Sequence, residues 1–334
     1  MNNKTKIYKI YSLIIKTVVI ILAFWFIYHR LFVKDNLAYV ISFEKYFNNR
    51  YVAGIIILTL LLMFFNWGLE SLKWQFLIRK IEKLSFIKAF IAVLSGMVVS
   101  VFTPNRIGEY AGRVFVLEKA DRWEGVLITI LGSMSQLLIT ILAGAVSFVF
   151  FANEYIDLSE YHEYYFYGLI FIIAILIIVL FLLFFNISFL TGIINKLPGK
   201  LSKFKNYGKI YSFYSVKELL YLLLLSLGRY MIFTTQFILL FMLFGIKMPY
   251  EQAFFMIAMI YLAMAAIPTI ALTELGVRGS VALYFINMYF EKHNLPCNDV
   301  GILAASSALW FINLAIPALF GVIFIFKLKL FRKS

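Results

Sequence analysis

Long apolar runs alternate with short charged stretches along most of the chain. A helix needs about 20 apolar residues to cross ~30 Å of hydrocarbon, and six runs approach or exceed this length: 8–31, 51–72, 125–151, 165–190, 218–245 and 300–326. Two further runs, 86–118 and 252–290, are interrupted by polar residues around a proline. Because proline ends or kinks a helix, each predicts a broken helical hairpin, either re-entrant or fully spanning. The pattern therefore predicts an all-α polytopic membrane protein with six spans and two hairpins.

The composition supports membrane insertion and changes how the charge is interpreted. Of the 334 residues, 63% are hydrophobic and 14% are charged, whereas soluble domains are about half apolar and roughly a quarter charged. The net charge of +14 does not indicate a nucleic-acid partner, because the basic residues lie in short loops between apolar runs. Cys297 is the only cysteine and the three histidines form no cluster with metal-ligand spacing, so we expect no disulfide and no metal.

Basic residues predict the orientation of the spans. They concentrate in four segments, 4–9, 73–88, 196–209 and 327–333, whereas the loop 152–164 is acidic. All four segments fall on one side if both termini are cytoplasmic, as the positive-inside rule requires. We therefore expect a multi-pass protein of a bacterial plasma (inner) membrane with both ends in the cytoplasm.

The predicted topology repeats itself in opposite orientation. Each half reads span, span, hairpin, span, and the first hairpin enters from the cytoplasm while the second enters from outside. This is the inverted-topology repeat of many secondary transporters. We expect a single transmembrane domain over 1–334, with one unit at about 1–151, a second at about 165–326, the outer loop 152–164 between them, and no soluble domain.

Ionisable residues within the apolar runs are the candidate functional residues. Each costs at least ~2.5 kcal/mol at the bilayer centre, and there are seven: Glu70, Arg106, Glu109, Arg113, Arg229, Glu274 and Arg278. Glu109 with Arg113 and Glu274 with Arg278 have the favourable i,i+4 spacing. Within each pair the two charges could simply neutralise one another. Arg106 and Arg229 would then be opposed only by Glu70, and surplus guanidinium suits a phosphate, which arginine binds with two hydrogen bonds.

Polar residues beside the two prolines could start the hairpin helices. Thr103 or Asn105 could cap the helix after Pro104, and Thr273 the helix that contains Glu274. Such helix starts would point free N–H groups at a bound anion. We interpret the neighbouring glycines, at 108, 112, 276 and 279, as sites of close helix packing.

The hairpin motifs resemble those of a known family. Residues 95–97 (Ser-Gly-Met), 103–109 (Thr-Pro-Asn-Arg-Ile-Gly-Glu) with Arg113, and 275–278 (Leu-Gly-Val-Arg) are similar to motifs of the lysylphosphatidylglycerol synthase transmembrane, flippase-like family. In the family pattern a glutamate follows the last arginine, whereas here Glu274 precedes the motif and Gly279 follows it. The resemblance covers nearly the whole chain and implies movement of anionic, aminoacylated or polyprenyl-linked lipids between leaflets.

The leading hypothesis is a lipid flippase-like transporter, not an enzyme, with the head group bound near mid-membrane between the hairpins. We expect no catalytic residue and no cofactor; the expected partner is a membrane lipid with a phosphate head group, and a homodimer or a separate lipid-modifying enzyme stays open. One alternative is a membrane-embedded transferase acting on lipid phosphate, although the acidic cluster that would hold Mg²⁺ is missing from the sequence. The other is a non-catalytic scaffold, which has no reason to keep buried charges.

Overall fold

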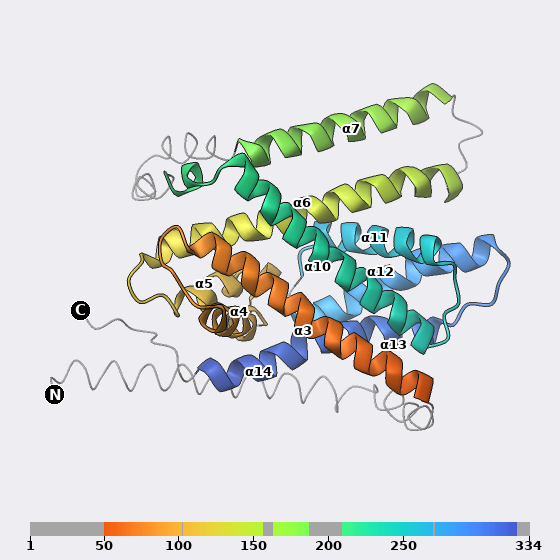
Figure 1. Ribbon diagram of the computed structural model, residues 1–334. Coiled ribbons are helices and arrows are strands. Elements are labelled where there is room, and N and C mark those ends of the chain that lie inside the picture. Colours follow the sequence, from red (N-terminus) through yellow and green to blue (C-terminus); the bar gives the residue numbers. More distant parts are fainter. Residues whose placement is uncertain (1–49, 102, 156–162, 187–208, 270, 326–334) are drawn as a thin grey trace.

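The computed structural model describes residues 50–101, 103–155, 163–186, 209–269 and 271–325, and every regular element in these ranges is helical (Figure 1). The elements are α3 (Arg50–Ile78), α4 (Phe86–Ser100), η2 (Pro104–Arg106), α5 (Gly108–Val114), α6 (Arg122–Tyr155), α7 (Glu163–Phe185), η4 (Lys209–Phe213), α10 (Val216–Leu243), α11 (Tyr250–Ala266), α12 (Ala271–Lys292), α13 (Asp299–Trp310), η5 (Phe311–Ala315) and α14 (Ile316–Ile325).

Five of the six predicted spans are confirmed, and the sixth, 8–31, lies outside the described residues. The helices long and apolar enough to cross a membrane cover Arg50–Ile78, Arg122–Tyr155, Tyr164–Phe185, Val216–Leu243 and Asp299–Phe324. The last one contains a π-helical turn, η5, between α13 and α14. In Figure 1 the long helices run from one end of the molecule to the other. The protein is therefore a multi-pass helical membrane protein.

The two proline-containing runs form broken hairpins that come from opposite ends and meet at their tips (Figure 1). The helix α4 has 15 residues, fewer than a spanning helix needs, and α11 has 17, which is at the lower limit of about 17 residues. At the tips, the Asn105 N–H donates to the Thr269 carbonyl oxygen at 2.8 Å. The Thr269 N–H donates back to the Asn105 side-chain oxygen at 3.0 Å.

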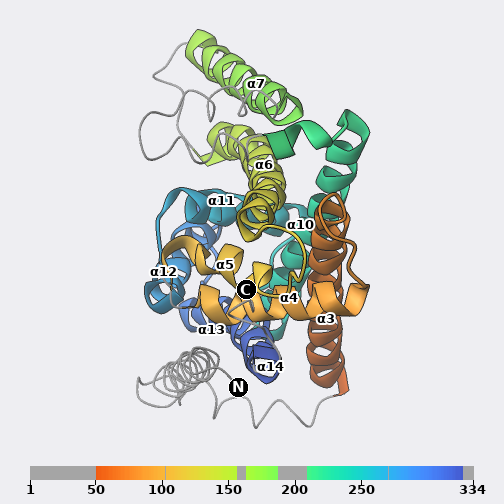
Figure 2. The same ribbon diagram turned by 90° about the vertical axis from the view of Figure 1, so that its left-hand side faces the viewer.

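Helix packing pairs elements of the two predicted units with each other. The helix α3 packs against α10, its counterpart, while α4 packs against α14 and α11 packs against α6. The two hairpins differ in detail, because α5 has 7 residues and α12 has 22. Figure 2 also shows α4 lying across the direction of the long helices. The unit boundaries at 1–151 and 165–326 stay a prediction, because both ranges include residues outside the described part.

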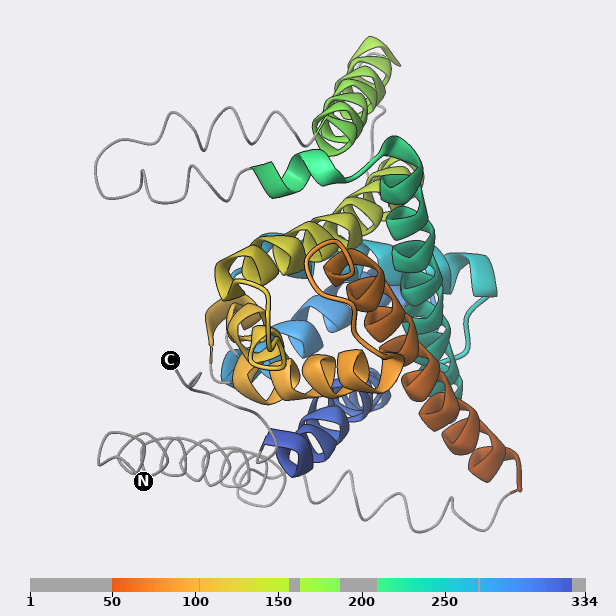
Figure 3. The same ribbon diagram turned by 60° about the vertical axis from the view of Figure 1, so that its left-hand side comes forward.

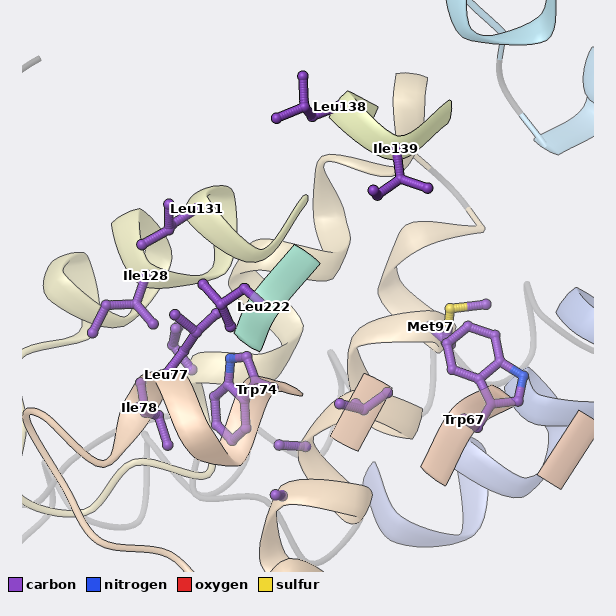
Figure 4. Close-up of a cluster of buried hydrophobic side chains, with 14 of the residues drawn as sticks. Trp67, Trp74, Leu77, Ile78, Met97, Ile128, Leu131, Leu138, Ile139 and Leu222 are labelled. Carbon is purple, nitrogen blue, oxygen red and sulfur yellow. The ribbon is translucent and has the colours of Figure 1, made fainter. Parts of the chain in front are cut away.

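Apolar side chains from distant segments form the core at one end of the bundle. Trp74, Leu77 and Ile78 of α3 lie beside residues of α6 and α10 (Figure 4). Burying a large apolar side chain contributes about 1.5–3 kcal/mol in water, but lipid removes most of that driving force, so close packing matters more. Figure 3 shows α3, α4 and α6 surrounding the region where α5 and α12 approach each other.

Glycines bring α4 and α5 into backbone contact. A Cβ atom on Gly112 would lie 2.6 Å from the Gly96 Cα, and one on Gly108 would lie 2.6 Å from the Val99 carbonyl oxygen. A Cβ on Gly279 would lie 2.9 Å from a Leu303 methyl. The packing interpretation is therefore confirmed for the glycines at 108, 112 and 279. It is wrong for Gly276, where a Cβ would meet no atom within 4 Å.

Candidate functional site

A cavity of about 600 Å³ lies where the hairpin tips meet α3, α6 and α10. Its lining includes the apolar side chains of Ile130, Met134 and Leu137 of α6, which we call the apolar wall. It also includes seven charged side chains: Glu70, Lys73, Arg106, Glu109, Arg229, Glu274 and Arg278. With Arg113, which lies directly behind them, these residues form what we call the charged cluster.

The carboxylate of Glu70 on α3 is the centre of one half of the charged cluster. Its oxygens lie 2.9 Å from Lys73 Nζ and 2.7 Å from Arg113 Nη1, and they also pair with Arg229. All four residues are buried, with Glu70 4% and Arg113 3% exposed. Removing one member of a buried ion pair costs more than the pair contributes, so these charges are mutually dependent.

Lys73 corrects the sequence interpretation, which placed it outside the membrane with the basic residues that follow the second span. The helix α3 continues to Ile78, and Lys73 is 1% exposed. Its ammonium is held by Glu70, three residues earlier on the same face, and lies 3.5 Å from the Ser226 hydroxyl of α10. The apolar residues that follow Lys73 were the signal that the helix continues.

Arg106 heads the other half of the charged cluster and corrects a second expectation. Together with Arg229 it was predicted to be opposed only by Glu70, yet its Nη2 lies 2.7 Å and 3.0 Å from the two carboxylate oxygens of Glu274. Glu274 also binds Arg278 at 2.6 Å, and Arg113 also pairs with Glu109. Both predicted i,i+4 pairs are therefore confirmed, but neither cancels in isolation. Arg106 and Glu274 are 168 residues apart, so only the fold brings them together.

The first hairpin turns through two residues with left-handed backbone. Asn105 has φ 48° and Arg106 has φ 58°, a conformation that non-glycine residues adopt at a cost and that clusters at functional sites. The bonds between Asn105 and Thr269 hold this turn in place. The backbone at the tip thereby directs the Arg106 side chain toward the second hairpin.

None of the three predicted capping residues directly precedes its helix, and the residue before α5 is Ile107. The Thr103 hydroxyl accepts a hydrogen bond from the Gly108 N–H at 2.7 Å at the start of α5. Asn105 does not cap α5, because its side-chain oxygen is used by Thr269. Thr273 is not the residue before its helix, because α12 already begins at Ala271.

Arg229 is oriented by neutral residues that the sequence interpretation did not include in the site. Its Nε donates to the Asn66 side-chain oxygen at 3.0 Å, and its Nη1 donates to the Gln136 oxygen at 3.4 Å. The Gln136 amide donates to the Ser226 carbonyl oxygen at 3.3 Å and so links α6 to α10. The guanidinium also lies 5.5 Å from the Trp67 ring centroid, within cation–π range.

A buried chain of amides continues from Arg229 away from the cavity. The Asn66 amide donates to Asn313 at 3.3 Å, and the Asn313 amide donates to Gln236 at 3.1 Å. Asn313 lies in the π-helical turn η5, and such turns are frequent at functional sites. The helices α3 and α10 and the turn η5 are therefore connected by hydrogen bonds as well as by packing.

The charged cluster has a positive surplus and unused donors. It contains five cationic side chains and three carboxylates, which leaves two positive charges without a counterpart in the cluster. Among the described residues, the Trp67 indole N–H and the Arg278 Nε are buried and have no hydrogen-bond acceptor. A bound anion would balance the surplus charge. No group of three His, Cys, Asp or Glu residues in the described ranges could hold a metal ion.

Fold and site together define a polytopic helical membrane protein with a charged cavity between two broken hairpins. The family model for the lysylphosphatidylglycerol synthase TM region matches residues 13–291, so the chain belongs to this family, as its motifs predicted. A search of curated proteins found no match, and neither did a search of solved structures.

Proposed function

We propose that this protein is a flippase-like transporter, not an enzyme, that moves an anionic, aminoacylated or polyprenyl-linked lipid between leaflets with its phosphate head group bound near mid-membrane. The observation that carries the proposal is the positive surplus of the charged cluster in a cavity with one apolar wall. The charged cluster suits a phosphate and the apolar wall suits a lipid chain.

The ion pair between the two hairpin tips supports a way in which phosphate binding could drive movement of the hairpins. A phosphate that takes the two-pronged grip of Arg106 would compete with the carboxylate of Glu274. Glu274 would keep Arg278 as its partner, so its release would not strand a buried charge. Binding would therefore loosen one link between the tips, and hairpins that come from opposite ends are the elements that alternating access requires.

Substitution of Arg106 tests the proposal. Arg106→Ala should reduce lipid movement in reconstituted vesicles by about 10- to 100-fold, because a hydrogen bond to a charged group contributes about 1.5–3 kcal/mol. Its thermal stability should stay near that of the natural protein, since Glu274 retains Arg278. Arg106→Lys should recover part of the rate. The matched control is Arg79→Ala, which removes a half-exposed arginine far from the cavity. Full transport by stable Arg106→Ala protein would refute the proposal.

The same vesicles separate the two alternatives. A transferase acting on lipid phosphate would change the mass of the head group, which lipid mass spectrometry would detect. A scaffold would move no lipid and would tolerate neutralisation of the charged cluster without any change in lipid distribution. A homodimer and a separate lipid-modifying enzyme stay predictions.

We further propose that the protein lies in a bacterial plasma membrane with both termini in the cytoplasm. The loop that contains exposed Lys83 and the loop that follows exposed Glu291 lie at opposite ends of the bundle (Figure 1). In a Cys297→Ser background, an impermeant thiol reagent applied to intact cells should label Glu291→Cys but not Lys83→Cys. The reverse labelling would overturn the orientation.

A further inference from the structure

The carboxylates of the charged cluster are all engaged by cations. Glu70 has three cationic partners, Glu274 has two, and Glu109 pairs with Arg113. A head group that carries an amine would need a free carboxylate, and the described cavity wall offers none. The surplus instead amounts to two positive charges, so an aminoacylated head group fits this cavity poorly.

The cationic and N–H donors that line the cavity come from several elements. Lys73 and Trp67 come from α3, Arg106 from the tip of the first hairpin, and Arg278 from α12. A phosphodiester offers two free oxygens and one negative charge to such a set. A terminal phosphate offers three acceptor oxygens and about −1.5 to −2 charges at neutral pH. Only the terminal phosphate balances the surplus and provides an acceptor for donors on several sides.

We infer that the cavity selects a terminal phosphate, a phosphomonoester or pyrophosphate, over a phosphodiester or an aminoacylated head group. This inference rests on the proposed function and specifies its substrate class. The apolar side chains of Ile130, Met134 and Leu137 line the same cavity as the donors and have the polarity of a lipid chain. The ligand is therefore the phosphate of a lipid rather than free phosphate.

Binding measurements on the purified full-length protein test this selectivity. The probes are phosphatidic acid, phosphatidylglycerol, lysylphosphatidylglycerol and inorganic phosphate, with affinities from native mass spectrometry or tryptophan quenching in detergent. At about pH 7.5 phosphatidic acid should bind at least about tenfold more tightly than phosphatidylglycerol, and lysylphosphatidylglycerol should bind most weakly. Inorganic phosphate should bind more weakly than phosphatidic acid, and equal binding would show that the lipid chain contributes nothing.

The preference for phosphatidic acid over phosphatidylglycerol should depend on pH, because the terminal phosphate of the ligand changes its charge. The second ionisation of a terminal phosphate lies near pH 6, so the preference for phosphatidic acid should shrink at about pH 5. The groups that face the ligand are the charged cluster and three tyrosines, Tyr110, Tyr230 and Tyr261. The described cavity wall contains no histidine, the side chain whose usual pKa lies nearest this range.

Lys73→Met provides the test on the protein side. It removes one cation while Glu70 keeps two arginines, so the phosphatidic acid preference should fall about tenfold while phosphatidylglycerol binding changes less. The control is Lys88→Met, at an exposed position on α4, which should leave both affinities unchanged. If Lys73→Met fails to fold, the pH dependence of the natural protein decides alone.

The outcomes separate this inference from the proposed function. The inference would be overturned if phosphatidylglycerol or lysylphosphatidylglycerol bound as tightly as phosphatidic acid or more tightly. It would also be overturned if the preference for phosphatidic acid did not change with pH. Either result would leave the proposed lipid transport in place. Failure of every phosphate lipid to bind would overturn both.

Discussion

Replacing Glu70 by glutamine removes the carboxylate that three buried cations share and keeps the size of the side chain. Loss of one partner from a buried ion pair costs about 3–5 kcal/mol. Two of the three cations keep other contacts, because Arg113 retains Glu109 and Arg229 retains Asn66. Lys73 loses its only carboxylate and keeps a 3.5 Å contact with a hydroxyl. The cost should therefore fall near the lower end, about 3 kcal/mol.

This loss is large enough to measure in detergent. One kcal/mol corresponds to about 2–4 °C in Tm for chains of 150–250 residues, so Glu70→Gln should lower Tm by about 6–12 °C. Differential scanning fluorimetry on the intrinsic tryptophans measures it. The control is Glu118→Gln, because Glu118 pairs with Lys88 where both side chains are 51% exposed, and such pairs contribute less than about 1 kcal/mol.

The Glu70→Gln variant should also be stabilised more strongly by a bound ligand than the natural protein is. Without Glu70 the charged cluster carries one more uncompensated positive charge, so phosphatidic acid should raise the Tm of Glu70→Gln by more than that of the natural protein. A Tm within about 2 °C of the natural protein, indistinguishable from Glu118→Gln, would refute the claim that these charges depend on one another.

Three further perturbations follow from the packing, the hairpin tip and the outer loop. Gly112→Val should destabilise the protein by about 1–3 kcal/mol or more, measured as a fall in Tm, because its Cβ would lie 2.6 Å from the Gly96 Cα. Asn105→Ala should cost about 1–3 kcal/mol in the same assay, because it removes the acceptor for the Thr269 N–H and places alanine at φ 48°. Burial raises the pKa of the Cys297 thiol to about 11, so its alkylation rate should rise about tenfold per pH unit from pH ~7 to ~10.

Each of these results has a matched comparison. Gly276→Val should leave Tm nearly unchanged, because a Cβ there meets no atom within 4 Å; equal effects at both glycines would contradict the packing explanation. Asn105→Gly should be less harmful than Asn105→Ala, because glycine tolerates positive φ, and the reverse order would mean that backbone strain at the tip is unimportant. A plateau in Cys297 alkylation near pH 9, as for a free thiol, would contradict the raised pKa.

The sequence by itself determined those features that depend on neighbouring residues. Apolar length predicted five described spans, and the prolines at 104 and 268 predicted where two runs break. The spacing of Glu109 from Arg113 predicted an ion pair, because residues four apart lie on one helix face. These predictions succeeded because helix length, helix breaks and i,i+4 contacts are set within one or two turns of chain.

The tertiary structure alone decided how the charges are shared. Arg106 was predicted to be opposed only by Glu70 and instead binds Glu274, 168 residues away. Lys73 was placed in a loop, although α3 carries it into the cavity. Periodicity carries no information about which helices become neighbours, and a buried charge takes whatever partner the packing brings near. The sequence predicted a surplus of one guanidinium, whereas the second surplus charge, that of Lys73, became visible only after α3, α10 and the two hairpins had been brought together.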